Sequence, residues 1–333
     1  MNNICIIGIY FGKKPKNFDI WLSSCGKNSK IDFLVVGDFK VDFKLENVKY
    51  INMKFDNFIK LAERKLDCQI CEVGPYKICD LKPVYGMILD EYIGEYLYWG
   101  HCDFDMIFGN LDKFLKKYNY EQYDKFLPLG HLCLYRNDGK KHYLEDTKTT
   151  YNAKKIFKSE NNCLFDEIGI NKIYYKYKFF DRIIFADIDP AYRQFREVEQ
   201  LSYYPKIYLD YRNTVGNINF RNQVFFYEDG GVYKAYLSRG KVKVKEYMYI
   251  HIQKRNIINK IEGAYDSYFI DNVLTKKDKG IPDKLIIKKH SMKWYFNFID
   301  RARYQLMRIK RYIDKRIIKK NTDNIVIPKD IFI

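Results

Sequence analysis

Nearly continuous apolar runs separated by polar stretches open the chain. Ile4–Tyr10 and Asp32–Asp38 are apolar at almost every position, which is typical of parallel strands buried on both faces. Lys49–Met53 is a candidate third strand, and Asp56 is a candidate N-cap for an amphipathic helix that ends near Leu66. The pattern predicts a nucleotide-binding α/β sheet.

Ligands of such a sheet lie beyond the carboxyl ends of its strands. Tyr10, Phe11 and Asp38 stand at those ends, where a nucleotide base and ribose would rest, and Gly12 belongs to the same donor-binding turn. The alternative is that these residues only form turns, since Phe11-Gly12 is a turn-forming pair.

A pair of aspartates follows the next strand. We expect a helix from Asp80 to about Tyr92, with Pro83 in its first turn. Tyr96–Cys102 is then an aromatic strand that leads directly into Asp103-Phe104-Asp105. Carboxylates at positions i and i+2 of an extended segment face the same side, so both approach one cation while Phe104 points into the core. This is the geometry of a metal clamp.

Such a clamp suits the transfer of a sugar from a nucleoside diphosphate. The leaving diphosphate concentrates negative charge, which Mn²⁺ or Mg²⁺ held by carboxylates neutralises. Two aspartates this close also occur by chance, but here an apolar strand precedes them and Gly109 closes the turn after them. Ile183–Pro190 is a rival, because it is also a strand with an aspartate pair, Asp187 and Asp189. It follows no nucleotide-binding unit of its own, so we favour the first pair.

The composition is that of a folded globular protein. The chain has 333 residues, of which 47% are hydrophobic and 17% aromatic, which excludes a disordered chain. We expect a catalytic domain over 1–283, divided into a nucleotide-binding half (1–109) and an acceptor half (110–283), and a C-terminal appendage over 284–333.

No apolar run approaches the roughly 20 residues that span a bilayer, and the eight cysteines have no disulfide-scaffold spacing. A cytoplasmic protein with reduced thiols is expected.

Most of the formal charge of +17 lies near the C-terminus, where residues 284–320 hold thirteen basic residues against two acidic ones. Apolar residues recur at helical spacing from Trp294 to Lys320, which predicts a basic amphipathic helix. Such a helix binds an anionic membrane surface, so the protein is expected to be peripheral at the inner face of the cell membrane. The alternative is that the helix packs its apolar stripe on the domain.

Several segments carry a resemblance to a known family. The strongest runs from Tyr76 to Gly109, and the likeness extends over about residues 4 to 255, including Gly130-His131 and Tyr249–Arg255. These segments resemble a bacterial family of GT-A-type glycosyltransferase-like proteins, many of them catalogued only as a domain of unknown function and associated with surface polysaccharide synthesis. The resemblance implies a GT-A-like α/β fold, a mostly parallel central sheet flanked by helices, with a C-terminal helical appendage.

The resemblance also implies roles for individual residues. Asp80 and Lys82 are similar to the acidic and basic residues that hold the donor sugar and ribose, although Lys82 stands where related toxin-type glucosyltransferases have arginine. Asp103 would bind both donor and metal. The remaining implied residues are the metal ligands Asp105 and His251 and the phosphate counter-charges Lys254 and Arg255. His251 is alternatively an ordinary strand histidine.

Asp166 and Glu167 follow an apolar segment and would line the acceptor pocket, one of them as general base if the reaction inverts. They are alternatively ordinary surface or capping acids. The predicted partners are a nucleotide-sugar donor, a UDP-sugar by resemblance, and a glycan or lipid-linked acceptor.

Two other functions remain open. A basic, aromatic-rich chain is compatible with nucleic-acid binding, but that function leaves the strand and its aspartate pair unexplained, so no nucleic acid is expected. A metal-dependent phosphohydrolase would also use paired aspartates, but it usually needs more clustered ligands than the segment around Asp103 offers.

Overall fold

The structure is a computed structural model, and it describes most of the chain. The described residues are 2–71, 74, 77–139, 152–161, 163–182, 186–187, 222–252, 257–261, 265–271, 273–291, 306 and 309.

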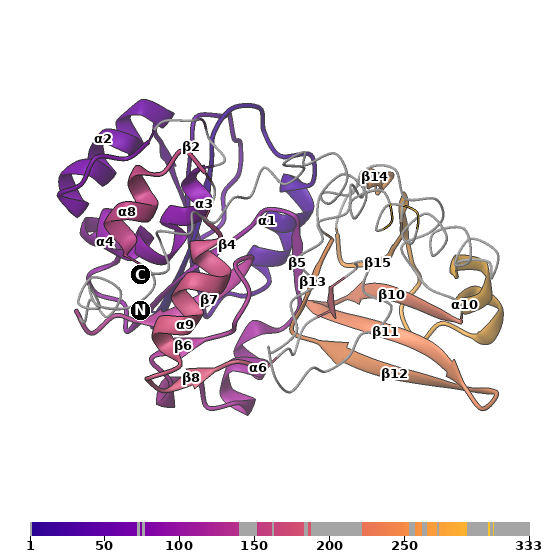
Figure 1. The fold of residues 1–333 in the computed structure, drawn as a ribbon. Coiled ribbons are helices and arrows are strands. Elements are labelled where there is room, and N and C mark those ends of the chain that lie inside the picture. Colours follow the sequence, from indigo (N-terminus) through magenta and orange to yellow (C-terminus); the bar gives the residue numbers. More distant parts are fainter. Residues whose placement is uncertain are drawn as a thin grey trace.

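A seven-stranded sheet forms the centre of the first part of the chain, in the order β3-β2-β1-β4-β7-β6-β8 (Figure 1). Its neighbouring pairs are parallel except for those that β7 makes with β4 and β6. The strands are β1 (Ile4–Tyr10), β2 (Asp32–Gly37), β3 (Val48–Asn52), β4 (Tyr98–Cys102), β6 (Lys125–Phe126), β7 (Leu132–Arg136) and β8 (Phe179–Phe180).

Helices cover both faces of this sheet, which explains the continuous apolar runs of its strands. In β1, Ile7 and Ile9 belong to one hydrophobic cluster while Ile4 and Ile6 belong to the other. The helices are α1 (Phe18–Gly26), α2 (Phe55–Leu66), α3 (Ile78–Leu81), η2 (Lys82–Val84), α4 (Tyr85–Ile88), α5 (Asp90–Ile93), α6 (Leu111–Lys117), η3 (Tyr120–Gln122), α8 (Ala153–Lys158), η4 (Phe165–Gly169) and α9 (Ile170–Tyr174). The expected α/β class, a mostly parallel sheet flanked by helices, is confirmed.

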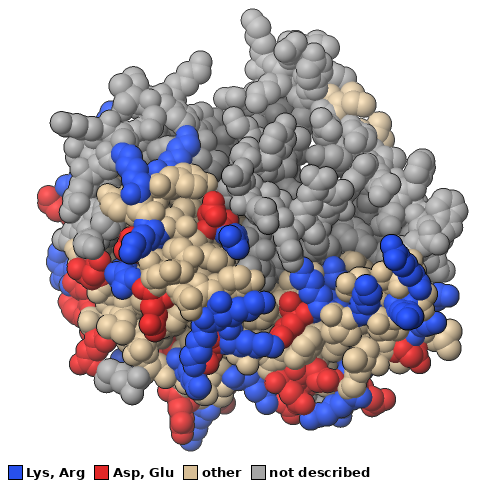
Figure 2. Space-filling view, turned by 90° about the horizontal axis from the view of Figure 1, so that it is seen from below, with Lys and Arg blue, Asp and Glu red and all other residues tan. Residues whose placement is uncertain are grey.

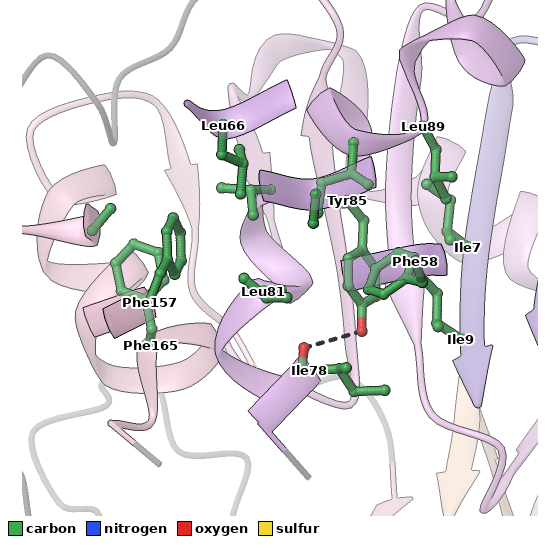
Figure 3. Close-up of a cluster of buried hydrophobic side chains, with 14 of the residues drawn as sticks. Ile7, Ile9, Phe58, Leu66, Ile78, Leu81, Tyr85, Leu89, Phe157 and Phe165 are labelled. Carbon is green, nitrogen blue, oxygen red and sulfur yellow. Dashed lines mark hydrogen bonds between the residues drawn. The ribbon is translucent and has the colours of Figure 1, made fainter. Parts of the chain in front are cut away.

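The first cluster joins helices that are far apart in the sequence. Figure 3 shows Phe58 of α2 and Tyr85 of α4 packed against the side chains of β1, with Phe157 and Phe165 to one side. The Tyr85 hydroxyl donates a hydrogen bond of 3.1 Å to the carbonyl of Ile78. Burial of these rings fixes the segment from residue 78 to 93 on the sheet.

Two expectations for local structure were wrong. The helix from Phe55 begins after Lys54, which is its N-cap and makes no side-chain cap, so Asp56 lies in the first turn, where its charge favours the helix dipole. The single helix expected from Asp80 to Tyr92 is divided into short pieces. Pro83 lacks an N–H group and sits in a 3₁₀ turn, because proline cannot continue the helical hydrogen-bond ladder.

A second sheet, mostly antiparallel, follows in the sequence and has the order β12-β11-β10-β15-β16-β14. A three-stranded sheet, β5-β13-β9, contains the strand that follows the aspartate pair. The strands are β5 (Met106–Phe108), β9 (Ala186–Asp187), β10 (Gln223–Glu228), β11 (Gly231–Ser238), β12 (Lys241–Tyr247), β13 (Tyr249–His251), β14 (Ile258–Asn259), β15 (Ser267–Ile270) and β16 (Val273–Lys276).

The C-terminal part is described only in part. Helix α10 (Lys284–His290) begins at the first residue of the predicted appendage, and Asp283 caps it. The amphipathic helix predicted over Trp294–Lys320 lies outside the described residues except for Leu306 and Ile309. None of the helices that the structure describes has the length and apolar character needed to cross a membrane. All eight cysteines are free thiols.

Candidate active site

The aspartate pair lies in the turn between β4 and β5, at the carboxyl edge of the central sheet. Phe104 is 6% exposed, and its ring centroid lies 4.7 Å from that of Trp21. A Cβ atom at Gly8 would lie 2.7 Å from this ring, so only glycine leaves room for Phe104 over β1. The side chains of Asp103 and Asp105 remain 34% and 28% exposed. Phe104 therefore fixes the turn while both carboxylates face outward.

His251 completes a group of three ligand atoms. β13 pairs antiparallel with β5, which places His251 opposite Met106, and the N–H of Ile252 donates to the carbonyl of Asp105 at 2.9 Å. Nε2 of His251 lies 3.5 Å from Oδ1 of Asp105. Asp103, Asp105 and His251 each offer one ligand atom, all within 4.8 Å of one another.

Two carboxylates and an imidazole are a donor set that fits a divalent cation such as Mn²⁺. Burial by itself raises the pKa of Asp105, but the nearby His251, by charge and hydrogen bond, outweighs it and lowers that pKa. The ionised carboxylate is therefore favoured, which is the form that binds a cation.

Lys82 connects this group to a second set of acids. Its ammonium is buried, lies 2.7 Å from Oδ1 of Asp103 and 3.3 Å from Oδ2 of Asp166, and donates to the carbonyl of Gly130 at 3.0 Å. Burial lowers the pKa of Lys82, but its acidic neighbours, Asp103 first among them, raise it well above its ordinary value. The site thus holds a permanent positive charge beside the aspartate pair.

Asp166 and Glu167 lie in the π-helical turn η4, next to Gly130. Burial raises the pKa of Asp166 to about 6, against the opposing effect of Lys82, and burial together with the Asp166 carboxylate raises the pKa of Glu167 to about 8. A Cβ atom at Gly130 would lie 2.4 Å from Oδ2 of Asp166 and 2.8 Å from Cγ of Glu167. Glycine at this position therefore allows the acids to approach Lys82.

Asp80 is fully buried. Its carboxylate accepts hydrogen bonds from the N–H groups of Cys163 and Phe165 at 3.0 to 3.1 Å and from the ammonium of Lys77 at 2.9 Å. These contacts anchor the segment that leads into Asp166. The predicted contact of Asp80 with the donor stays a prediction.

The other predicted donor-binding residues lie at the ends of β1 and β2. The ring of Tyr10 is 40% exposed and lies 5.9 Å from that of Phe104. The N–H of Gly12 donates to Oδ1 of Asp38 at 2.6 Å, which joins the two strand ends. Phe11 is buried and packs on Phe55 and Phe58 at centroid distances of 5.4 and 5.6 Å, so its ring belongs to the core.

Some predicted residues cannot be placed. Lys254, Arg255 and Asp189 lie outside the described residues. Of the rival segment only β9, Ala186–Asp187, is described, and it pairs parallel with β13 so that Asp187 is opposite His251. The second aspartate pair therefore begins beside the first in the fold, although far from it in the sequence.

From the sequence, His131 was identified only as part of the resemblance, and its contacts in the site were missed. Its carbonyl accepts a hydrogen bond of 2.9 Å from the N–H of Asp103, and its ring stacks on that of His251 with centroids 4.1 Å apart. It therefore contacts two of the three candidate ligands. These contacts bridge distant parts of the chain, so spacing along the sequence gives no sign of them.

A sequence model of the family described as "Family of unknown function (DUF6625)" matches residues 6–278. The chain belongs to this family. The resemblance drawn from Tyr76–Gly109 pointed to a family catalogued in this way, and the match confirms it. All the described residues of the DUF6625 candidate site lie within the matched region.

The comparisons with individual proteins give weaker likenesses. No curated protein matches the chain. One solved structure that matches is the galactosyltransferase LgtC in complex with donor and acceptor sugar analogues, with 11% identity, a TM-score of 0.33, and coverage of 55% of this chain and 74% of that one. Another is the glycosyltransferase GlyE of Streptococcus pneumoniae TIGR4, with 9% identity, a TM-score of 0.29, and coverage of 54% and 45%. At these TM-scores neither likeness carries an argument about function.

Proposed function

We propose that this DUF6625 protein is a metal-dependent glycosyltransferase that moves a sugar from a nucleoside diphosphate to an acceptor hydroxyl. The observation that carries the proposal is the convergence of Asp103, Asp105 and His251 within 4.8 Å of one another at the carboxyl edge of a mostly parallel sheet. Ligands of open α/β sheets bind at such edges. The proposed donor is a UDP-sugar and the proposed cation is Mn²⁺ or Mg²⁺, which would supply Lewis-acid stabilisation of the diphosphate.

The neighbouring residues have complementary tasks in this proposal. The exposed ring of Tyr10 offers a stacking surface for the base. The Lys82 ammonium, 2.7 Å from Asp103, offers a fixed positive charge to the donor as negative charge develops on the leaving group. Because the ammonium of Lys82 is already held in place, it stabilises the developing charge without having to move far during the reaction.

Asp166 is the better candidate for a general base in an inverting reaction. With a pKa of about 6, Asp166 is ionised at neutral pH, whereas Glu167, with a pKa of about 8, is protonated and has a hydroxyl proton to donate. Asp166 would accept the proton of the acceptor hydroxyl, and Glu167 would orient that hydroxyl. The proposed acceptor is a glycan or a lipid-linked sugar.

A thermal-shift experiment tests the proposal. UDP, GDP and CMP would each be added to the wild-type protein and to the matched Asp105→Asn variant, with and without Mn²⁺. We expect one nucleoside diphosphate to raise the unfolding temperature of the wild type only when Mn²⁺ is present, and the variant to lose this shift. A shift that does not need the metal, or that nucleic acid alone produces, would contradict it.

The expected association with an anionic membrane also stays a proposal. The residues predicted to carry it over Trp294–Lys320 lie almost entirely outside the described part of the chain, but helix α10 provides an independent argument.

A further inference from the structure

Several apolar side chains near the C-terminal end of the described residues are exposed. Ile281 is 68% exposed, Leu285 is 76% exposed and Ile286 is 36% exposed, and Leu306 and Ile309 follow at 65% and 55%. Leu285 has the highest exposed fraction of the large apolar residues that the structure describes. A single exposed leucine is ordinary on a protein surface, but neighbouring ones form a patch that marks an interaction site.

Helix α10 is held to the second sheet by its opposite side. Ile287 is fully buried in a cluster with Phe226 and Ala235, and the ring of His290 stacks on Phe269 at 4.1 Å. Successive residues of a helix are 100° apart, so Leu285, two residues before Ile287, faces away from the sheet. The sheet therefore contacts α10 through the side that carries Ile287, and the opposite side of the helix does not contact the sheet.

The exposed surface of α10 is also positively charged. Lys284, Lys288 and Lys289 are exposed, and no ion pair is described for any of them among the residues that the structure describes. By contrast, Lys277 and Lys279, just before the helix, bind Glu228 and Asp229 at 2.6 and 2.8 Å. Figure 2 shows basic side chains on both sides of the molecule, including the side where the second sheet lies, with acidic side chains among them.

We propose that Ile281, Leu285 and Ile286, with Lys284, Lys288 and Lys289, form a docking surface for an anionic lipid bilayer. The apolar side chains would enter the boundary between headgroups and acyl chains, and the lysines would contact the headgroups. A nucleic-acid backbone would use the lysines but gain nothing from the exposed leucine and isoleucines, which favours the bilayer. This surface begins beyond residue 278, where the family match ends, and the proposal stands independently of glycosyl transfer.

Co-sedimentation of the full-length protein with lipid vesicles tests the docking surface. The vesicles would contain phosphatidylcholine alone or phosphatidylcholine mixed with phosphatidylglycerol. We expect binding only to the mixed vesicles, and a loss of about 25-fold for the Lys288→Gln, Lys289→Gln double variant, because each basic residue near an anionic surface contributes about fivefold, or about 1 kcal/mol. Leu285→Ser should weaken binding about tenfold, also at high salt, because apolar insertion is not screened.

A matched variant on the second sheet separates docking from general attraction. Val242 packs toward the cluster under α10, so Lys241 and Lys243, its neighbours in β12, point to the other face of the sheet. The Lys241→Gln, Lys243→Gln variant removes the same charge and should change binding by less than about threefold. The altered side chains are all largely exposed, so the unfolding temperature should stay unchanged.

Three results would overturn the proposal. The first is wild-type vesicle binding by both α10 variants. The second is an equal loss in the Lys241, Lys243 control. The third is a loss in the lysine variant together with unchanged binding of Leu285→Ser, which would mean that the surface binds anions without entering a bilayer.

Discussion

The first large sheet of this protein is mostly parallel and the second is mostly antiparallel, and the candidate site lies in the turn from β4 of the first sheet to β5 of the three-stranded sheet. β1 and β2 are covered on both faces and end at the candidate donor site. The hairpin of β11 and β12 belongs to an antiparallel sheet at the other side of Figure 1. The chain then returns through β13, which brings His251 to Asp105. The candidate catalytic groups therefore lie at the edge of the first sheet, and the second sheet has a supporting role.

The largest effect is expected at the aspartate pair. Asp103→Asn and Asp105→Asn keep the shape of the turn but remove one carboxylate charge each, so donor turnover should fall by about a thousandfold or more, a loss of about 4 kcal/mol of transition-state stabilisation. Hydrolysis of a panel of nucleotide-sugars measures this, with the unfolding temperature as the check on folding. Retained activity would shift the assignment to Asp187 and Asp189.

A smaller loss is expected from crowding the acid pair. In Gly130→Ala the new methyl group would meet Oδ2 of Asp166 at 2.4 Å, so Asp166 must move away from Lys82. We expect turnover to fall by about 10²-fold, as for a misplacement of about 1 Å, with a destabilisation of about 1–3 kcal/mol. The matched control is Gly94→Ala, whose nearest contact is the Asp90 carbonyl at 3.4 Å. Equal kinetics for both variants would count against the proposed role of the acid pair.

The raised pKa of Glu167 predicts a dependence of stability on pH. Glu167 has a pKa of about 8 in the folded protein against an ordinary 4.5, so the folded state retains a proton that the unfolded chain has lost. The contribution of Glu167 to the free energy of unfolding is therefore fully present below about pH 4.5, and it is lost as the pH rises toward 8. Glu167→Gln should be more stable than the wild type near pH 8.5, by on the order of 2 kcal/mol, and should lose this advantage near pH 4.

Chemical denaturation at both pH values measures the difference between wild type and Glu167→Gln. If the variant has the same advantage at both pH values, the advantage comes from packing alone, which would contradict a protonated, partly buried Glu167.

The smallest effect on turnover is expected from the second sheet. Lys277 is buried, lies 2.6 Å from Glu228 and contacts the ring of Phe226 at 4.8 Å. Lys277→Met should lower the free energy of unfolding by about 1–3 kcal/mol, while turnover of the remaining folded protein changes less than about twofold. The exposed pair of Lys279 with Asp229 is the control, and Lys279→Met should cost less than about 1 kcal/mol. A selective loss of turnover in Lys277→Met would show that the second sheet takes part in catalysis.

The sequence predicted the first sheet well because burial on both faces leaves a clear pattern. Ile4–Tyr10 is the observed strand β1 to the residue, and Phe104 packs inward as the alternation required. The second sheet was missed as a separate layer. In β12 lysines alternate with valines, and such an edge strand resembles a polar loop when its partners are unknown.

The candidate site could be predicted where its residues are adjacent in the sequence, and His251 was added only by the resemblance, whereas contacts between distant segments were missed. Asp103 and Asp105 follow directly from one strand and one turn. The stacking of His131 on His251 and the bridge from Lys82 to Asp166 join segments far apart along the chain. Gly130 gave no sign of its role, since its need for space arises only after Asp166 is placed beside it.

The most direct test of the central claim is X-ray diffraction at the manganese absorption edge from a crystal grown with Mn²⁺ and UDP. The anomalous signal should locate the ion about 2–2.3 Å from a carboxylate oxygen of Asp103, one of Asp105 and Nε2 of His251, with the diphosphate on the ion's open side. An ion and nucleotide bound together away from the turn between β4 and β5 would contradict the account.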